Sequence, residues 1–372
     1  MGTVVGAGFA SGQEVLRFFS HFGRLGTAGV MGAALLLMAG GAAMCELGRR
    51  TRAASFGDAL LTLGGPVAGR VLDGAMAFLL FGGTAVMTAG SGALFQEHLG
   101  LASWLGSAVL VVAAVGTVAF GLRGVVAANR VVVPVLVTSV LAVSASSVLA
   151  RGMWPGWTWW QPGAAAHPSL AVATVLYASY NLFLSLGVLA PLGASTRSFR
   201  TVAAGGILGG LGLGAAALVV HLGVLSSLPS SAGMAIPMLE AAATLPPWAR
   251  TGYALVLFAE IYTTAVANLF ALERRLTSTP RRPGGDGSSG RAGGAGPSRG
   301  ARGTTALSLG GTARPRGSRG RAASLVGMGL LALVASRLGF PRLVVTIYPL
   351  AGYVGLLVLL ALPVALWRTR RL

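Results

Sequence analysis

The chain has 372 residues, of which 54% are hydrophobic and only 10% are charged, with a formal net charge of +19. A soluble protein carries about 25% charged residues, so this composition excludes an ordinary soluble domain and indicates a membrane protein. All 28 basic residues are arginine, and most of them lie between apolar segments. This placement argues against a nucleic-acid-binding protein. The single cysteine, Cys45, excludes an intrachain disulfide.

Apolar segments of spanning length recur along the chain, since a membrane-spanning helix needs about 20 mostly apolar residues. The sequence predicts ten spans, at 1–22, 27–48, 71–96, 103–122, 130–150, 169–190, 202–226, 248–272, 322–338 and 343–366. The expected fold class is therefore an all-α, polytopic membrane protein. Because five is odd, two halves of five spans, 1–150 and 169–366, would enter the membrane from opposite sides and form an inverted repeat.

Arginine placement predicts the orientation, because cytoplasmic loops are enriched in positive charge. With both termini in the cytoplasm, the inner side holds eleven arginines and the outer side six, before residues 274–321 add eleven more to the inner side. All seven tryptophans then fall at the two membrane interfaces. The Gly-, Arg-, Ser- and Pro-rich linker 277–320 is predicted to be disordered, either touching anionic lipid or serving as a spacer.

The first span contains a run of poor helix formers. Residues 6–12 read Gly-Ala-Gly-Phe-Ala-Ser-Gly, and an amide and a carboxylate follow directly. A helix break inside a bilayer is tolerated where it is buried in protein or lines a polar cavity, and transporters use such breaks to bind solutes. The alternatives are a close helix contact made by small residues and a Glu14 that only caps the outer half-helix. The candidate substrate-binding residues here are Gly6, Ala7, Gly8, Ser11, Gly12, Gln13 and Glu14.

The sixth span carries a second polar stretch, Tyr177-Ala178-Ser179-Tyr180-Asn181, near its middle. Paired interrupted segments in the two halves are the best sequence indication of a transporter site, so we expect this span to be interrupted as well. Its candidate substrate-binding residues are Ser179, Tyr180 and Asn181, although an aromatic side chain there is as often part of the core. The segment 234–245 is amphipathic and predicts a helix on the outer face, as a lid or as packing.

The eighth span places a carboxylate deep in the membrane. Glu260 lies 12 residues after Trp248, or about 18 Å along a helix. An intramembrane carboxylate is costly and is a functional-site hypothesis by default, the alternative being a neutral side chain hydrogen-bonded to a neighbouring helix. Thr263 and Thr264 follow, and their hydroxyls suit Na⁺ unless they only bond to their own helix. The candidate ion-coupling residues are Glu260, Thr263 and Thr264.

Three stretches together carry a family resemblance: 6–14 in the first span, 176–182 in the sixth and 259–264 in the eighth. They resemble the YkvI-like family of bacterial membrane proteins, which is similar to the amino acid–polyamine–organocation superfamily. The resemblance implies a five-plus-five inverted repeat, a transporter-like fold and the bacterial cytoplasmic membrane. It also implies that Thr263 and Thr264 match a hydroxyl pair that faces the carbonyls of the first-span break in sodium-coupled relatives. Family members carry a few more helical turns before the glycine motif, so we expect a misassigned start codon or a truncated copy.

The leading hypothesis is a secondary transporter of a small polar or zwitterionic solute, an amino acid being the candidate class, driven by Na⁺ or H⁺. The alternative is a sensor or scaffold that keeps the fold without transporting. An enzyme is not expected, because the sequence has no nucleophile motif, phosphate-binding loop or metal-ligand spacing. The expected partners are the solute and the lipid bilayer, with no nucleic acid and no cofactor apart from Na⁺ as the candidate coupling ion.

Overall fold

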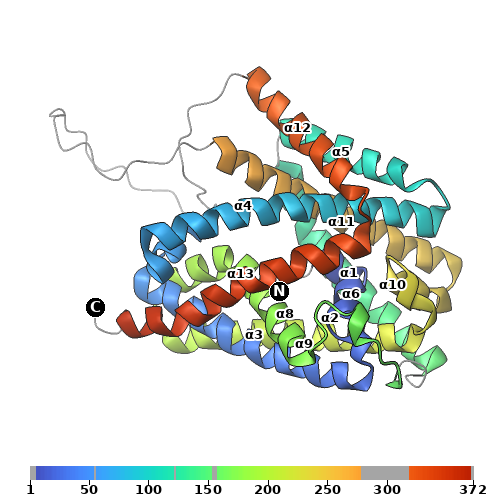
Figure 1. Cartoon of the computed structure of the whole chain (residues 1–372), viewed down its shortest axis with the longest axis horizontal. Helices are drawn as coiled ribbons and strands as arrows, with labels where there is room; N and C mark the ends of the chain where they lie inside the picture. Colours follow the sequence, from blue (N-terminus) through green and yellow to red (C-terminus); the bar gives the residue numbers. More distant parts are fainter. Residues whose placement is uncertain (1–5, 54–55, 121–122, 153–156, 278–317, 370–372) are drawn as a thin grey trace, which may run out of the picture.

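A computed structural model describes residues 6–53, 56–120, 123–152, 157–277 and 318–369. The secondary-structure elements of this part of the chain are all helices, and Figure 1 shows the long ones packed side by side. The helices are α1 (Ala7–Ala10), α2 (Gln13–Phe18), α3 (Arg24–Thr51), α4 (Phe56–Leu99), α5 (Ser103–Phe120), α6 (Arg123–Arg151), α8 (Leu170–Ala194), α9 (Phe199–Ser227), α10 (Pro237–Ala241), α11 (Pro247–Thr277), α12 (Ser318–Ser336) and α13 (Phe340–Arg368).

Every predicted span has a helical counterpart in the described residues. Eight helices are long and apolar enough to cross a membrane, and a shorter apolar helix covers Ala322–Ser336. The first span is divided between α1 and α2. The prediction of an all-α, polytopic membrane protein is therefore confirmed. Residues 278–317 of the predicted linker lie outside the described residues, while Thr277 ends α11 and residues 318–320 begin α12.

The helix contacts repeat when the two halves are exchanged. α4 packs against α5, α12 and α13, and its counterpart α11 packs against α12, α5 and α6. Likewise α3 contacts α9, α8 and α13, whereas α9 contacts α3, α2 and α6. Figure 1 shows α4 and α13 running side by side, with α5 and α12 together at one edge. These paired contacts are those that an inverted repeat requires, and the boundaries 1–150 and 169–366 remain a prediction.

Glycines let the central helices touch backbone to backbone. A side chain at Gly48 of α3 would collide with the Ala190 carbonyl of α8, and one at Gly193 with the Cys45 carbonyl of α3. Further along α8, a side chain at Gly355 of α13 would collide with the α8 backbone at Ser179. Small residues at contacts are how helices associate in lipid, where no hydrophobic effect drives them together.

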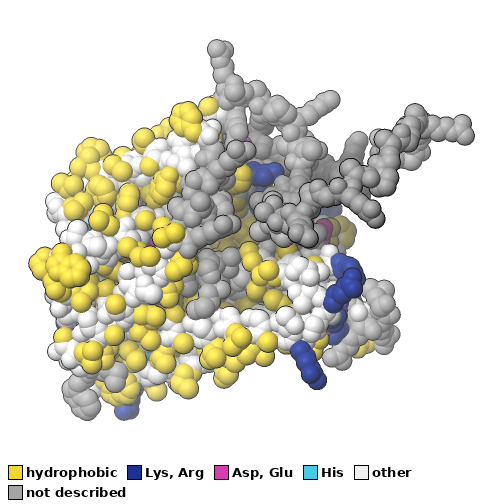
Figure 2. All heavy atoms as spheres, turned by 180° about the vertical axis from the view of Figure 1, so that it is seen from behind, with side chains coloured by type: hydrophobic (Ala, Val, Ile, Leu, Met, Phe, Trp, Pro, Cys, Tyr) yellow, Lys and Arg dark blue, Asp and Glu magenta, His cyan; other side chains and the backbone are white. Residues whose placement is uncertain are grey.

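The outside of the molecule is apolar, as a lipid-facing surface must be. Large hydrophobic side chains point outward from several helices, among them Leu35, Val112 and Trp248, which are 65%, 73% and 78% exposed. Figure 2 shows hydrophobic side chains spread over the face seen there, with arginines gathered mainly toward one end. Four tryptophans of the predicted belts, at 104, 160, 248 and 367, are more than half exposed, while Trp154 lies outside the described residues.

Candidate functional site

The first span is broken at Ser11 and Gly12. Gly12 adopts a left-handed conformation, with φ +77° and ψ −8°, and the residues on either side are helical. Glycine reaches this region of φ without the steric penalty that a Cβ brings. A Cβ at Gly12 would also lie 2.7 Å from Cγ of Met238, so both the backbone and the packing require glycine there. The break predicted from the glycine motif is thus present.

The carbonyl groups released by the break are bound by other parts of the protein. The Tyr253 hydroxyl of α11 donates a hydrogen bond to the Ala10 carbonyl, and the Met238 amide of α10 donates to the Ser11 carbonyl over 3.0 Å. The Ser11 hydroxyl turns back to the Gly8 carbonyl at 2.9 Å. Since an unpaired carbonyl in a membrane costs several kcal/mol, these contacts stabilise the break.

A buried carboxylate faces a cluster of phenols next to the break. Glu14 is 3% exposed, and its Oε1 accepts a hydrogen bond from the Tyr180 hydroxyl of α8. The Tyr180 ring stacks on Tyr348 of α13, with ring centroids 5.3 Å apart, and meets Tyr177 edge-on at 5.5 Å. The buried Tyr177 hydroxyl is close to this carboxylate but makes no well-formed hydrogen bond within the described part of the chain. Two helices of the second half thereby enclose a carboxylate of the first.

Gly8 packs directly against this cluster. A Cβ there would meet the Tyr348 hydroxyl at 2.5 Å and Oε2 of Glu14 at 3.1 Å. Gly6, by contrast, has nothing within 4 Å of its Cβ position, so packing does not require glycine at residue 6. Ala7 is fully buried in α1. The glycines of the motif therefore have different roles: Gly12 forms the break, and Gly8 makes room for Glu14 and Tyr348.

Gln13 is the most conspicuous unpaired group of the site. Its side chain is fully buried, and neither its amide nitrogen nor its amide oxygen has a hydrogen-bond partner among the described residues. A buried amide left without partners costs about 1–3 kcal/mol, which a bound solute or water would recover. Gln13 and Glu14 together place an unpaired donor, an unpaired acceptor and a carboxyl group at one end of the break.

The expected interruption of the sixth span is wrong, because α8 runs as one helix from Leu170 to Ala194. Its polar side chains bond within the helix instead of breaking it: Ser179 Oγ donates to the Val175 carbonyl at 2.6 Å and Asn181 Nδ2 to the Tyr177 carbonyl at 2.9 Å. No glycine lies between residues 171 and 186 to favour another backbone conformation. Tyr180 therefore reaches the site, whereas Ser179 and Asn181 make no hydrogen bond with α1 or α2 in the described residues.

The ion-coupling candidates form their own cluster on α11. Glu260 is 4% exposed. Its Oε1 accepts a hydrogen bond from Thr264 Oγ1 at 3.3 Å, and its Oε2 is buried without a partner among the residues that the structure describes. Thr263 Oγ1 donates to the Glu260 carbonyl at 3.2 Å. Glu260 lies seven residues after Tyr253, so it shares the face that contacts α1, about 10 Å further along the helix. Their role in ion coupling stays a prediction.

A folded segment covers one side of the break. The helix predicted over 234–245 is instead the short α10, flanked by the 3₁₀ turns η3 (Ser230–Gly233) and η4 (Ala242–Thr244). Pro237 begins α10, and Leu245, which precedes Pro246, is extended and ends the segment. Glu97 of α4 accepts hydrogen bonds from the amides of Ala235 at 2.6 Å and Ile236 at 3.0 Å, which fixes the segment over Gly12.

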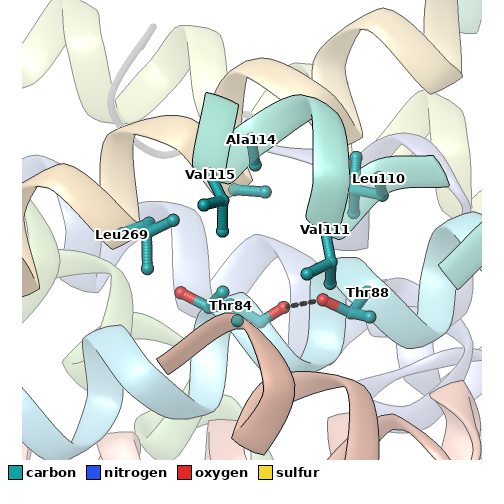
Figure 3. Close-up of a pocket in the computed structure, with 9 residues that line it drawn as sticks. Thr84, Thr88, Leu110, Val111, Ala114, Val115 and Leu269 are labelled. Carbon is teal, nitrogen blue, oxygen red and sulfur yellow. Dashed lines mark hydrogen bonds between the residues drawn. The ribbon is translucent and has the colours of Figure 1, made fainter. Parts of the chain in front are cut away.

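One small gap between helices lies elsewhere and is not a solute site. It measures about 10 Å³ and is lined by α4, α5, α11 and α12. Figure 3 shows mainly aliphatic side chains around it, with the Thr88 hydroxyl bonded to the Thr84 carbonyl of the same helix at 2.8 Å. This volume holds a single water at most, so the gap is a packing defect.

Comparison with known proteins identifies the relatives of this chain. It is 30% identical over 364 residues to the uncharacterized membrane protein YkvI of Bacillus subtilis (strain 168), covering 96% of this chain and 91% of YkvI. The chain belongs to the YkvI family. The uncharacterized protein YyaD of the same organism is 25% identical over 287 residues, covering 74% of this chain and 79% of YyaD. No family model matches the chain.

The fold of this YkvI-family protein is similar to that of a solved structure, MhsT in complex with L-phenylalanine. The TM-score is 0.62 at 15% sequence identity, and the likeness covers 99% of this chain and 96% of MhsT. This similarity extends over the whole chain and supports the membrane fold described above.

Sequence reasoning missed three residues that contact the candidate site of this YkvI-family protein or its covering segment. Tyr348 packs on Tyr180, Tyr253 binds the break, and Glu97 fixes the covering segment. Their polar side chains inside or next to apolar spans could have indicated them, because a polar group away from water needs a partner. Their partners lie far away in the sequence, so the motif alone did not indicate them.

Proposed function

We propose that the protein is a secondary transporter of a small polar or zwitterionic solute, with an amino acid as the candidate class. The observation that carries the proposal is the broken first span with Gln13 and Glu14 buried beside the break. A merely structural contact between small residues does not need an unpaired amide and a carboxylate at such a place. Solute binding accounts for both.

Glu14 is the group that we propose for the positive end of the solute. A carboxylate surrounded by the rings of Tyr177, Tyr180 and Tyr348 offers both an ion pair and aromatic faces to an ammonium group. The Gln13 amide can donate and accept hydrogen bonds, and it is the candidate partner for the other polar groups of the solute. MhsT is bound to L-phenylalanine, a zwitterion with an ammonium group, which supports the same class of solute for this chain.

In this proposal, the contacts around the break correspond to a closed form of the transporter. Tyr253 and Met238 occupy the Ala10 and Ser11 carbonyls. If α10 moved away from Gly12, the Ser11 carbonyl would become available and the site would open toward the side covered by α10. We propose that this movement, followed by opening on the opposite side, carries the solute across the cytoplasmic membrane, with both chain termini in the cytoplasm.

Coupling to an ion is proposed at α11. Glu260 presents an unpaired carboxylate oxygen beside the hydroxyl of Thr264, a pair suited to a proton or to Na⁺. Oxygen ligands of this kind are hard donors that suit a small alkali cation. We favour Na⁺, because Thr263 and Thr264 add adjacent hydroxyls to the carboxylate.

A binding screen tests this function. The purified protein is incubated with each standard L-amino acid, in Na⁺ and in K⁺, while its thermal unfolding is recorded. We expect at least one amino acid to raise the melting temperature, and more in Na⁺ than in K⁺. A protein that responds to none of them, and whose melting temperature is the same in both salts, would support the sensor or scaffold alternative.

A further inference from the structure

A second site lies at the end of the molecule that is opposite to the covering segment. A cavity of about 420 Å³ opens between the C-terminal end of α3 and the connection from α8 to α9. It is far larger than the roughly 30 Å³ that one water takes in the liquid. The residues that line it are Arg49, Arg52, Ala194, Ser195, Thr196 and Arg197. Half of them are arginines, so the cavity is strongly basic.

The two walls of this cavity are held rigidly. Gly48 of α3 touches the backbone of α8 at Ala190, and Gly193 of α8 touches the backbone of α3 at Cys45. These contacts lie within a turn of the lining residues on each helix. A binding site supported by packed helices keeps its geometry better than one formed by loops alone. The arginines therefore extend from a fixed frame.

Two of the three arginines are free to bind an anion. Glu46 already accepts hydrogen bonds from Arg49, at 2.7 Å from both Nε and Nη2, and from Arg50. Arg52 and Arg197, in contrast, form no ion pair within the part of the chain that the structure describes. The positive charge of the cavity thus lies mainly with Arg52 and Arg197, and Glu46 offsets that of Arg49.

The backbone at Arg52 has an unusual conformation. Its φ is +53° and its ψ is +35°, and it is the non-glycine residue with a positive φ in the described chain. A residue with a Cβ rarely adopts this region, and such outliers concentrate at functional sites. Here the conformation ends α3 and keeps Arg52 at the rim of the cavity. The same turn leads into Ala53, which is buried.

The surroundings of the cavity are those of a membrane interface. Arg50 donates through Nη1 to the Leu366 carbonyl of α13 at 3.0 Å, so the C-terminal end of α13 lies close by. Trp367 and Phe199, each 56% exposed, add the aromatic side chains typical of the headgroup level. Arginines gather toward this end in Figure 2. A ligand with an anionic head and apolar tails fits both the cavity and its rim.

We propose that this cavity binds the phosphate of an anionic phospholipid, with Arg52 and Arg197 as its ligands. Guanidinium groups bind phosphate oxygens in pairs of hydrogen bonds, and basic pockets between transmembrane helices bind anionic headgroups on the cytoplasmic side. Free phosphate shares this chemistry but has no tails, so lipid and phosphate can be distinguished. The proposal is independent of the solute site.

The test measures lipid binding to the full chain in a neutral detergent by native mass spectrometry. The probes are phosphatidylglycerol, phosphatidylcholine and inorganic phosphate. We compare wild type with Arg52→Gln/Arg197→Gln and with a control, Arg24→Gln/Arg337→Gln, that removes two exposed arginines from the opposite end. We expect wild type and control to prefer phosphatidylglycerol over phosphatidylcholine. The cavity variant should bind phosphatidylglycerol more weakly than wild type, by a factor of about ten or more.

Three outcomes would overturn the proposal. Equal loss in the control and the cavity variant would assign lipid binding to general surface charge. Unchanged binding in the cavity variant would place the lipid elsewhere. Competition by millimolar phosphate, without any preference for phosphatidylglycerol, would make the ligand a free anion. Arg197→Lys keeps the charge and loses the paired geometry, so it should bind phosphatidylglycerol with intermediate affinity. This conservative variant separates loss of the site from a folding defect in the double variant.

Discussion

The Tyr180 hydroxyl on α8 donates a hydrogen bond to the Glu14 carboxylate on α2, and this contact joins the two halves of the chain at the helix break. Tyr348 on α13 stacks on the same tyrosine. Three helices therefore meet around one carboxyl group that is 3% exposed. In a membrane such a group needs partners, and the Tyr180 phenol supplies one hydrogen bond. In the proposed function this carboxyl group binds the cationic end of the solute.

The glycine motif gives the first prediction. Gly8→Leu should abolish solute binding while the protein still inserts, because a side chain there would displace Tyr348 and Glu14. Gly6→Ala is the matched control, since its Cβ position is open, and it should bind as wild type does. Thermal unfolding with and without the solute measures both. Unchanged affinity of Gly8→Leu would reduce the motif to helix packing.

The second prediction separates the two coupling ions. If Na⁺ is the ion, Thr264→Ala should weaken Na⁺-dependent binding, because it removes the hydroxyl that lies 3.3 Å from the Glu260 carboxylate, and Glu260→Gln should have the smaller effect. If a proton is the ion, Glu260→Gln should uncouple transport from the pH gradient while solute exchange continues. Uptake under separate Na⁺ and pH gradients distinguishes these cases. If both variants stay active and uptake depends on neither ion, α11 has only a packing role.

Helix packing gives the third prediction. Gly48→Ala should destabilise the protein by about 1–3 kcal/mol, since the added methyl collides with the α8 backbone. Gly205→Ala on α9, where nothing lies within 4 Å, should be neutral or stabilising by up to about 1 kcal/mol. Unfolding in detergent measures the difference. Equal stabilities would show that α3 and α8 do not touch as described.

Orientation is the fourth prediction, and it rests on the arginine and tryptophan positions. With Cys45 replaced by alanine, new cysteines at Ser195 and Thr158 should react with an impermeant thiol reagent from opposite sides of the membrane. Both positions are exposed. In intact cells Thr158→Cys should react and Ser195→Cys should not. The reverse pattern would invert the proposed topology.

Much of the fold could be predicted from the sequence, because span length and apolar composition are local properties. The break at Gly12 was also predictable, since glycines and a serine are poor helix formers wherever they occur. The interruption of α8 was also predicted from a local property, the polar residues near its middle, and that prediction was wrong. Ser179 and Asn181 are polar, but Ser179 Oγ and Asn181 Nδ2 donate hydrogen bonds to the backbone of their own helix, so polarity alone does not break a helix.

The remainder of the site depends on contacts between distant segments. Tyr253 lies 243 residues from its partner Ala10, and Glu97 lies 138 residues from Ala235. No local pattern encodes such pairs, because they exist only once the halves have packed. The cavity at Arg52 and Arg197 is a further case, since α3 and the α8–α9 connection meet there through glycines that are unremarkable in the sequence.

The most direct test of the central claim is uptake of radiolabelled L-amino acids into vesicles that contain the purified protein. We expect wild type to accumulate at least one amino acid above its external concentration under an inward Na⁺ or proton gradient, and to lose this accumulation when the gradient is dissipated. Glu14→Gln should abolish accumulation, whereas Arg337→Gln, remote from the break, should retain it. Equal accumulation by Glu14→Gln and wild type, or none by wild type under either gradient, would contradict a transport site at the first-span break.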